Sequence, residues 1–141
     1  MTLASILQKR SDAVVKVTPD TPVRSVVQLL ADHRIGAVPV VEDDQVVGIM
    51  SERDVIYSLR RDGAAILEWP VERVMTRPAI TVESSTTAIA GLSLMTKRRI
   101  RHLPVVDDGR LIGFISIGDL VKVRIELIEA DAEAMRAYIA G

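Results

Sequence analysis

The amino-acid sequence predicts an α/β fold of the α+β kind, in which two βαββα repeats pack face to face with pseudo-twofold symmetry and a C-terminal helical extension follows. The first observation is an internal repeat. A shift of 65 residues places Val17–Asp54 on Val82–Asp119, and 12 of the 38 aligned positions are identical. The second is the same order of strand, turn and helix signals in both copies, and the third is a long helical pattern after the second copy. Together they indicate a duplicated small unit with an added helix.

Each copy is expected to contain a short strand, a helix, a two-stranded hairpin and a closing helix. Thr21 and Thr86 are the expected N-caps of the first helices, and Ser51 and Ser116 are those of the closing helices. Runs of β-branched and apolar residues predict the strands, at residues 14–17, 37–41 and 45–50 in copy one and 79–82, 102–106 and 110–115 in copy two.

The repeat also suggests a division of the chain. A sheet of about three strands with one bare face is near the lower limit of what folds alone. We therefore expect the two copies to cover each other and to form a cleft at their interface, where ligands often bind. The expected division is repeat one at residues 1–61, a linker and approach to repeat two at 62–77, repeat two at 78–123 and the C-terminal helix at 124–141.

The C-terminal helix is expected to contribute to a homodimer. No Gly or Pro interrupts the chain between Gly118 and Gly141. A seam of apolar residues along this helix spans fewer than three heptads. We therefore expect the helix to reinforce a dimer rather than to form a free coiled coil. Alternatively, the helix covers the N-terminal apolar residues Leu3, Ile6 and Leu7. The apolar residues of the seam follow alternating spacings of four and three: Val121, Ile125, Ile128, Ala132, Met135 and Ile139.

Composition excludes several classes of function. Eighteen Lys and Arg oppose 19 Asp and Glu, so the chain lacks the basic excess typical of nucleic-acid binders. It has no Cys, and its two histidines, His33 and His102, do not make a metal site. We see no signal peptide and no apolar run of about 20 residues, and expect a cytoplasmic protein. No nucleophile–base pair, paired carboxylates or phosphate-binding Gly motif is visible, so we do not expect an enzyme.

Three motifs resemble those of a tandem pair of CBS domains, the family named after cystathionine β-synthase. They are the strand signatures IGAVPVV (35–41) and IRHLPVV (100–106), the Gly-x-x-Ser-x-x-Asp motif at 48–54 and 113–119, and the VMT tripeptide at 74–76. The resemblance implies a stand-alone regulatory module that acts on an unidentified target protein and dimerises as a flat disc. It also implies an adenosyl ligand (AMP, ADP, ATP or S-adenosylmethionine, or in some members NAD) and no catalytic cofactor.

Each Ser-x-x-Asp motif has two roles open to it. A Ser at an N-cap with an acid three residues later is a capping box, which by itself explains Ser51 with Asp54 and Ser116 with Asp119. In addition, a carboxylate in the first helical turn can accept hydrogen bonds from ribose hydroxyls, and free N–H groups at a helix start can bind phosphate. The resemblance assigns the ribose-binding role to Asp54 and Asp119.

The resemblance also places a threonine, here Thr76, against the nucleoside. A plain loop hydroxyl is the alternative for this residue. The equivalent place in copy one is near Arg10-Ser11, which departs from the family pattern. Val15 and Ile80 are the expected apolar walls of the site.

The start of each hairpin lies where the family contacts base and phosphate. In copy one, Ile35, Gly36 and Ala37 leave space and exposed backbone groups that suit the edge of adenine. Copy two has Ile100, Arg101 and His102 at the same place. Arg101 offers a planar fork for phosphate and His102 a donor of tunable charge. The alternatives are a solvated Arg101 and a buried, hydrogen-bonded His102.

Three functions follow from these patterns. The first is a non-catalytic sensor that binds an adenine nucleotide in the cleft between the repeats. The second is a ligand-free dimerisation or interaction module. The third, a nucleic-acid binder that uses the basic cluster at residues 97–101, is disfavoured by the charge balance.

Overall fold

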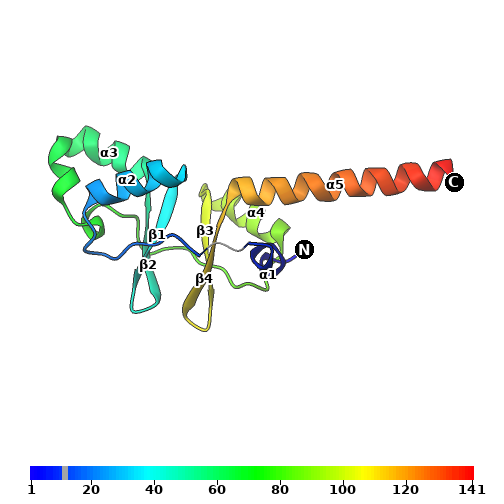
Figure 1. Ribbon diagram of the computed structural model, residues 1–141, viewed down its shortest axis with the longest axis horizontal. Coiled ribbons are helices and arrows are strands. Elements are labelled where there is room, and N and C mark those ends of the chain that lie inside the picture. Colours follow the sequence, from blue (N-terminus) through cyan, green and yellow to red (C-terminus); the bar gives the residue numbers. More distant parts are fainter. Residues whose placement is uncertain (11–12) are drawn as a thin grey trace.

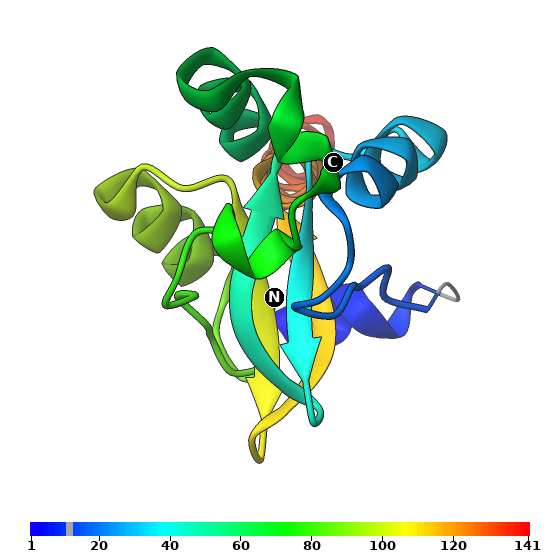
Figure 2. The same cartoon turned by 90° about the vertical axis from the view of Figure 1, so that its left-hand side faces the viewer.

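Two antiparallel hairpins form the centre of the molecule (Figures 1 and 2). The computed structural model describes residues 1–10 and 13–141. Strands β2 and β4 pack against each other between the two halves, so the predicted face-to-face arrangement of two repeats is confirmed. The strands are β1 (Ala37–Glu42), β2 (Gln45–Ser51), β3 (His102–Asp107) and β4 (Arg110–Ser116). The helices are α1 (Leu3–Gln8), α2 (Val23–His33), α3 (Glu52–Asp62), the 3-10 helices η1 (Gly63–Glu68) and η2 (Val71–Arg73), α4 (Ala88–Arg98) and α5 (Ile117–Ala140).

Matched backbone turns give the two halves the same shape. Asp43 and Asp44 turn the first hairpin with φ of 52° and 64°, and Asp108 and Gly109 turn the second with φ of 50° and 77°. Two consecutive residues with positive φ are what a tight two-residue hairpin requires. Both hairpins also shift register at the same place, between Val40/Val41 and Val105/Val106.

The prediction of first strands at residues 14–17 and 79–82 is wrong. Each contributes one parallel bridge, Val17 to Val40 and Val82 to Val105, and no named strand. In copy one the next residues are Thr18 and Pro19, and a proline has no N–H with which to extend a ladder. Each segment therefore touches the edge of its hairpin once and then turns towards a helix.

Two of the four expected caps are also corrected. Helix α2 has Pro22 at its N-cap, and the Thr21 hydroxyl instead accepts a hydrogen bond from the N–H of Thr18 at 3.2 Å. Helix α4 is capped by Thr87, one residue after Thr86, through the N–H of Ala90 at 3.1 Å. The caps of α3 and α5 are as predicted.

Each half has its own apolar core, and each core takes in a segment from outside its repeat sequence. The first core includes Ile66 and Val71 of the linker, both fully buried. The second includes Leu3 and Ile6 of α1 together with Leu120 of α5. The N-terminal helix thus packs on the second half of the molecule. The boundaries expected at residues 61, 77 and 123 stay a proposed division.

Helix α5 runs for 24 residues and projects away from the rest of the molecule (Figure 1). Its first turns are anchored, because Leu120 is fully buried and Val123 packs against the second core. The alternative of a tail packed on Leu3 and Ile6 therefore holds only for these first turns. Within residues 1–10 and 13–141, no helix combines the length and apolar character that a membrane crossing needs.

Candidate functional site

Two clefts lie at the seam between the halves and combine residues of both. Cleft one has a volume of about 290 Å³, close to the lower end of the range of small-molecule sites. It draws on the start of α3 in the first half and on the segment before α4 and the start of β3 in the second. The predicted site residues that line it are Gly36, Ser51, Asp54, Thr76, Ile80, Ile100, Arg101 and His102.

Cleft two is the pseudosymmetric counterpart, with a volume of about 970 Å³. It combines the start of α5 with the segment that follows residue 12 and with the start of β1. The predicted site residues that line it are Val15, Ile35, Gly36, Ala37, His102, Ser116 and Asp119. All the predicted site residues therefore line one cleft or the other, and Gly36 and His102 line both.

The capping boxes are present in both repeats. Asp54 Oδ2 accepts hydrogen bonds from the N–H of Ser51 at 2.9 Å and from its hydroxyl at 3.0 Å, and the Ser51 hydroxyl accepts from the N–H of Asp54 at 3.2 Å. Ser116 and Asp119 repeat the backbone bonds at 2.8 and 3.2 Å. Each aspartate side chain is thereby fixed at the first turn of its helix. The cap uses one carboxylate oxygen and leaves the other directed elsewhere.

Thr76 completes cleft one rather than a site within repeat two. Its hydroxyl donates to Asp54 Oδ1 at 2.8 Å. Its backbone pairs with Ile49 through two hydrogen bonds of 2.9 Å, which fix it beside β2. A Cβ on Gly48 would lie 2.6 Å from Met75 Sδ and 2.9 Å from the Thr76 carbonyl oxygen. Only glycine at this position allows the segment to lie so close to β2.

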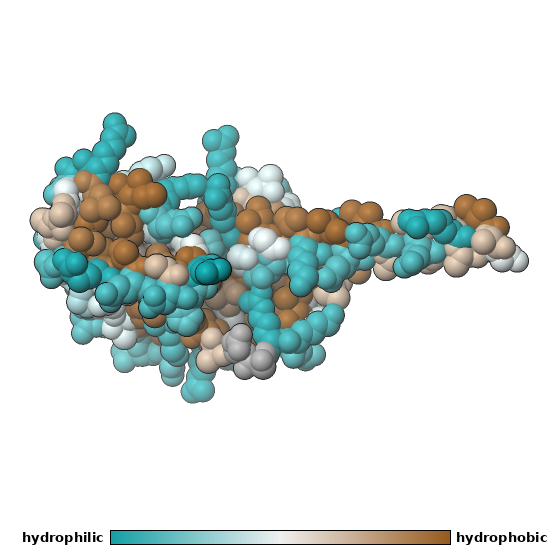
Figure 3. Space-filling model, turned by 45° about the horizontal axis from the view of Figure 1, so that its top comes forward, coloured by the Kyte–Doolittle hydropathy of each residue, from teal (hydrophilic) through white to brown (hydrophobic). Residues whose placement is uncertain are grey.

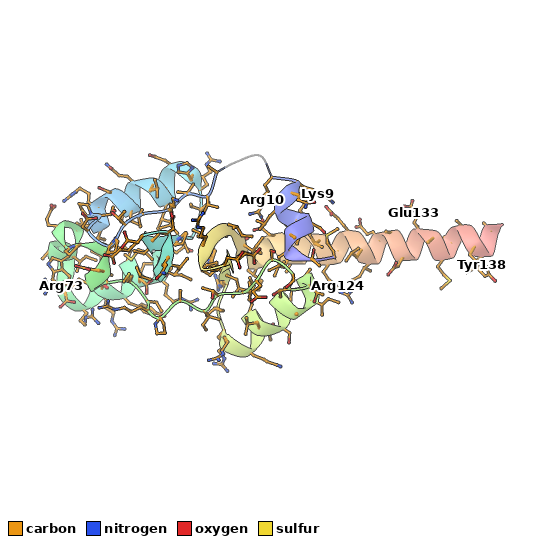
Figure 4. All side chains as sticks on the ribbon, turned by 90° about the horizontal axis from the view of Figure 1, so that it is seen from below. Lys9, Arg10, Arg73, Arg124, Glu133 and Tyr138 are labelled. Carbon is orange, nitrogen blue, oxygen red and sulfur yellow. The ribbon has the colours of Figure 1, made fainter. Side chains whose placement is uncertain are left out.

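Asp119 in cleft two has a charged partner instead. Arg10, two residues after the end of α1 (Figure 4), reaches Asp119 Oδ2 at 2.6 Å and donates to the Phe114 carbonyl oxygen at 3.0 Å. Partial burial tends to raise the pKa of Asp119, but hydrogen bonds from Ser116 and Arg10 outweigh it and hold that pKa below its usual value. Ser11, which with Arg10 stands near the place in copy one that is equivalent to Thr76, lies outside the described residues.

His102 lies between the two clefts. Its ring stacks on Phe114 with centroids 5.4 Å apart and planes 10° apart. Burial lowers the pKa of His102, an effect that Arg101 supports and that the carboxylates of Asp119 and Glu52 oppose. The ring is therefore neutral at pH 7 and can both donate and accept a hydrogen bond.

Some lining residues were not anticipated from the sequence. Arg99 belongs to the recognised basic cluster, but its position at the cleft depends on a left-handed turn, φ 53°, that ends α4. Arg53 and Glu52 lie inside the Ser-x-x-Asp motif, so their position at cleft one could have been inferred from that motif. Arg10 and Phe114 join cleft two from segments far apart in the chain. With Arg53, Arg99 and Arg101 against Glu52 and Asp54, the lining of cleft one has more positive than negative side chains.

Comparison with known proteins gives matches along most of the chain. The family model described as CBS domain matches twice, at residues 6–61 and 71–126. The CBS domain-containing protein CBSX3, mitochondrial, of Arabidopsis thaliana is 34% identical over 129 residues. That match covers 88% of this chain and 63% of the relative, so the chain spans less than two thirds of the length of that protein.

Solved structures agree in fold. The CBS-domain containing protein ATU1752 from Agrobacterium tumefaciens superposes with a TM-score of 0.82 at 38% identity, over 88% of this chain and 99% of that one. A structure of CBSX2 in complex with AMP has a TM-score of 0.75 at 27% identity, over 89% and 97% of the two chains. With the doubled family match and the paired hairpins, these similarities show that the chain belongs to the CBS domain family as a tandem pair of CBS domains.

Proposed function

We propose that the chain is a non-catalytic regulatory module that binds an adenine nucleotide in cleft one. The observation that carries the proposal is the arrangement of Asp54. The capping box and Thr76 fix its carboxylate at the cleft, and each carboxylate oxygen can accept more than one hydrogen bond. Three of the roughly four acceptor sites of this carboxylate are already used, so ribose hydroxyls would take the remaining site and displace the donating hydroxyl of Ser51 or Thr76.

The rest of cleft one suits the other parts of a nucleotide. Ile80 and Ile100 offer apolar surface for a purine ring, and Gly36 lines the same cleft without a side chain. A phosphate would find the positive end of α3, an 11-residue helix, and the guanidinium groups of Arg53, Arg99 and Arg101. The N–H groups of Ser51, Glu52 and Asp54 already donate within the protein, so the guanidinium groups would supply most of the hydrogen bonds. The AMP complex of CBSX2 supports an adenosyl ligand. The candidate ligands are AMP, ADP, ATP, NAD and S-adenosylmethionine.

Cleft two is a second nucleotide site in this proposal, with Asp119 in the place of Asp54. Arg10 pairs with Asp119 Oδ2 at 2.6 Å and offsets part of its negative charge, so hydrogen bonds from a ribose to this carboxylate would be weaker than those to Asp54. We therefore place the stronger binding in cleft one. Val15, Ile35 and Ala37 would form the apolar wall of cleft two.

A cytoplasmic location, a homodimer and an unidentified target protein belong to the same proposal. As a second candidate function, a ligand-free dimerisation module is favoured by the exposed apolar stripe of α5, where Ile125 and Ile128 are each 50% exposed.

A thermal-shift panel separates the two functions. A ligand at about a hundredfold excess over its Kd stabilises the folded state by ~2.7 kcal/mol. AMP, ADP, ATP, NAD and S-adenosylmethionine at millimolar concentration should therefore include at least one compound that raises the Tm by several degrees. GMP serves as the base-specificity control. A panel without any shift would reject the sensor function and leave the dimerisation module.

A further inference from the structure

Helix α5 carries an apolar stripe that the described residues of the same chain leave largely uncovered. Along it, Val121 is 41% exposed, Ile125 and Ile128 are each 50%, Met135 is 61% and Ile139 is 76%. In proteins, most of the stability of a helix comes from packing its apolar face rather than from helix propensity. A stripe of this kind therefore needs a partner surface.

The stripe follows a heptad pattern without interruption. Ile125, Ala132 and Ile139 occupy a positions, and Val121, Ile128 and Met135 occupy d positions. The outer b positions are Glu126 and Glu133. Figure 4 shows Arg124, Glu133 and Tyr138 distributed along the projecting helix. The seam is thus one-sided, as pairing with a single further helix requires.

We propose that α5 pairs in parallel with α5 of a second copy of this chain. The proposal is independent of nucleotide binding and rests on the residues that flank the seam. In a parallel pair each g position faces the e position of the next heptad on the other helix, and charges there set orientation. Arg124 at g then faces the partner's Glu129, and Asp131 at g faces the partner's Arg136. By symmetry each attractive pair forms twice.

The antiparallel arrangement of the same seam is disfavoured by the same charges. There e faces e and g faces g. Lys122 would face the partner's Arg136, while Glu129 and Asp131 would each face their own copies on the partner. The a and d residues fit either direction, so the flanking charges decide for the parallel one.

A second exposed apolar surface extends the parallel contact. On α3, Ile56 is 60% exposed and Tyr57 is 62%. Figure 3 shows apolar surface at the end of the molecule that α2 and α3 form, and again along α5, on the same face. A second copy that lies on this face with α5 parallel would cover both. This addition compensates for a seam of fewer than three heptads.

Cysteine cross-linking tests the direction directly, because the natural chain has no Cys. Met135→Cys places a thiol at a d position, which faces its own copy in a parallel pair and lies near the partner's Ile125 in an antiparallel one. Glu133→Cys, on the outer face, is the matched control. Under mild oxidation we expect the full-length Met135→Cys protein to form a disulfide-linked dimer and the control to remain largely monomeric on non-reducing gels. Equal cross-linking of the two variants would overturn the parallel pairing.

Charge reversal adds a test that leaves the seam intact. Glu129→Arg puts like charges opposite each other twice and should weaken the dimer roughly tenfold in sedimentation velocity at low salt. Adding Arg124→Glu should restore it, and Glu133→Arg should have no effect. A Glu129→Arg protein that dimerises like the natural one would count against the pairing. A natural chain that stays monomeric at several hundred micromolar would end the proposal and leave the stripe for a different protein.

Discussion

The hydroxyl of Thr76, in the linker, donates a 2.8 Å hydrogen bond to Oδ1 of Asp54 in repeat one. The bond joins the segment before repeat two to the first turn of α3. It leaves the second carboxylate oxygen to the capping box. Cleft one therefore has a carboxylate fixed from two sides before any ligand arrives, which reduces the ordering cost of binding.

Asp54→Asn should weaken nucleotide binding about tenfold or more, because a hydrogen bond to a charged group is worth roughly 1.5–3 kcal/mol net. Asparagine keeps the size of the side chain and one accepting oxygen, but the bonds from Ser51 and Thr76 lose their charged acceptor, so the free energy of unfolding of the ligand-free protein should fall by about 1 kcal/mol. Isothermal titration measures the affinity and urea denaturation the stability. Asp119→Asn is the matched control in cleft two and should affect binding less. Equal affinity losses in both variants would contradict the preference for cleft one.

Arg101→Ala should weaken the binding of AMP and ATP far more than that of adenosine, since only the first two carry phosphate. Arg101 is exposed and lines cleft one. Lys97→Ala removes a charge from the same basic cluster at a residue outside the lining of the cleft, and should leave all three affinities nearly unchanged. Competition titrations give the ratios. If adenosine loses as much affinity as AMP, Arg101 does not contact phosphate.

Gly48→Ala should lower the free energy of unfolding by about 1–3 kcal/mol, as overpacking typically does. The new Cβ would lie 2.6 Å from Met75 Sδ and 2.9 Å from the Thr76 carbonyl oxygen. The second atom is backbone and cannot move without shifting Thr76, so nucleotide affinity should fall as well. Gly118→Ala is the control, because its Cβ meets only Ser116 Oγ at 3.6 Å and alanine favours a helix by up to about 1 kcal/mol. Unchanged stability in Gly48→Ala would show that the Met75–Thr76 segment can move freely.

His102 should make the protein less stable as the pH falls below the ordinary histidine pKa of 6.5. Burial, the main cause, lowers the pKa of His102 in the folded state. Between that lowered pKa and 6.5 the unfolded state binds more protons than the folded state, so the free energy of unfolding rises with pH across this window. Asp107 and Asp119 have lowered pKa values too. Both titrate near and below 3.8, in a separate window.

Urea denaturation at about pH 7.5 and 5.5, on either side of the ordinary histidine pKa, measures this effect. His102→Gln should reduce the stability difference between the two conditions. His33→Gln, at the exposed last turn of α2, should keep the difference of the natural chain. A His102→Gln protein with an unchanged pH dependence would assign the effect to other groups.

The sequence by itself determined most of the local structure of both repeats, apart from the N-caps of α2 and α4 and the segments before them. The 65-residue offset reveals the duplication, and the β-branched runs with two-residue turns predict both hairpins. The spacing of Ser and Asp predicts the capping boxes of α3 and α5, which are present. These features depend on residues within about a turn of one another, so periodicity and cap chemistry suffice to find them.

Tertiary structure alone decided which residues share a cleft. Thr76 precedes repeat two in sequence but bonds to Asp54 of repeat one, and Arg10 crosses to Asp119 of repeat two. Both outcomes arise because α1 packs in the second core while the linker residues Ile66 and Val71 pack in the first. Such exchanges depend on which apolar face has space to bury a short segment. That is a property of the assembled cores and of no local pattern.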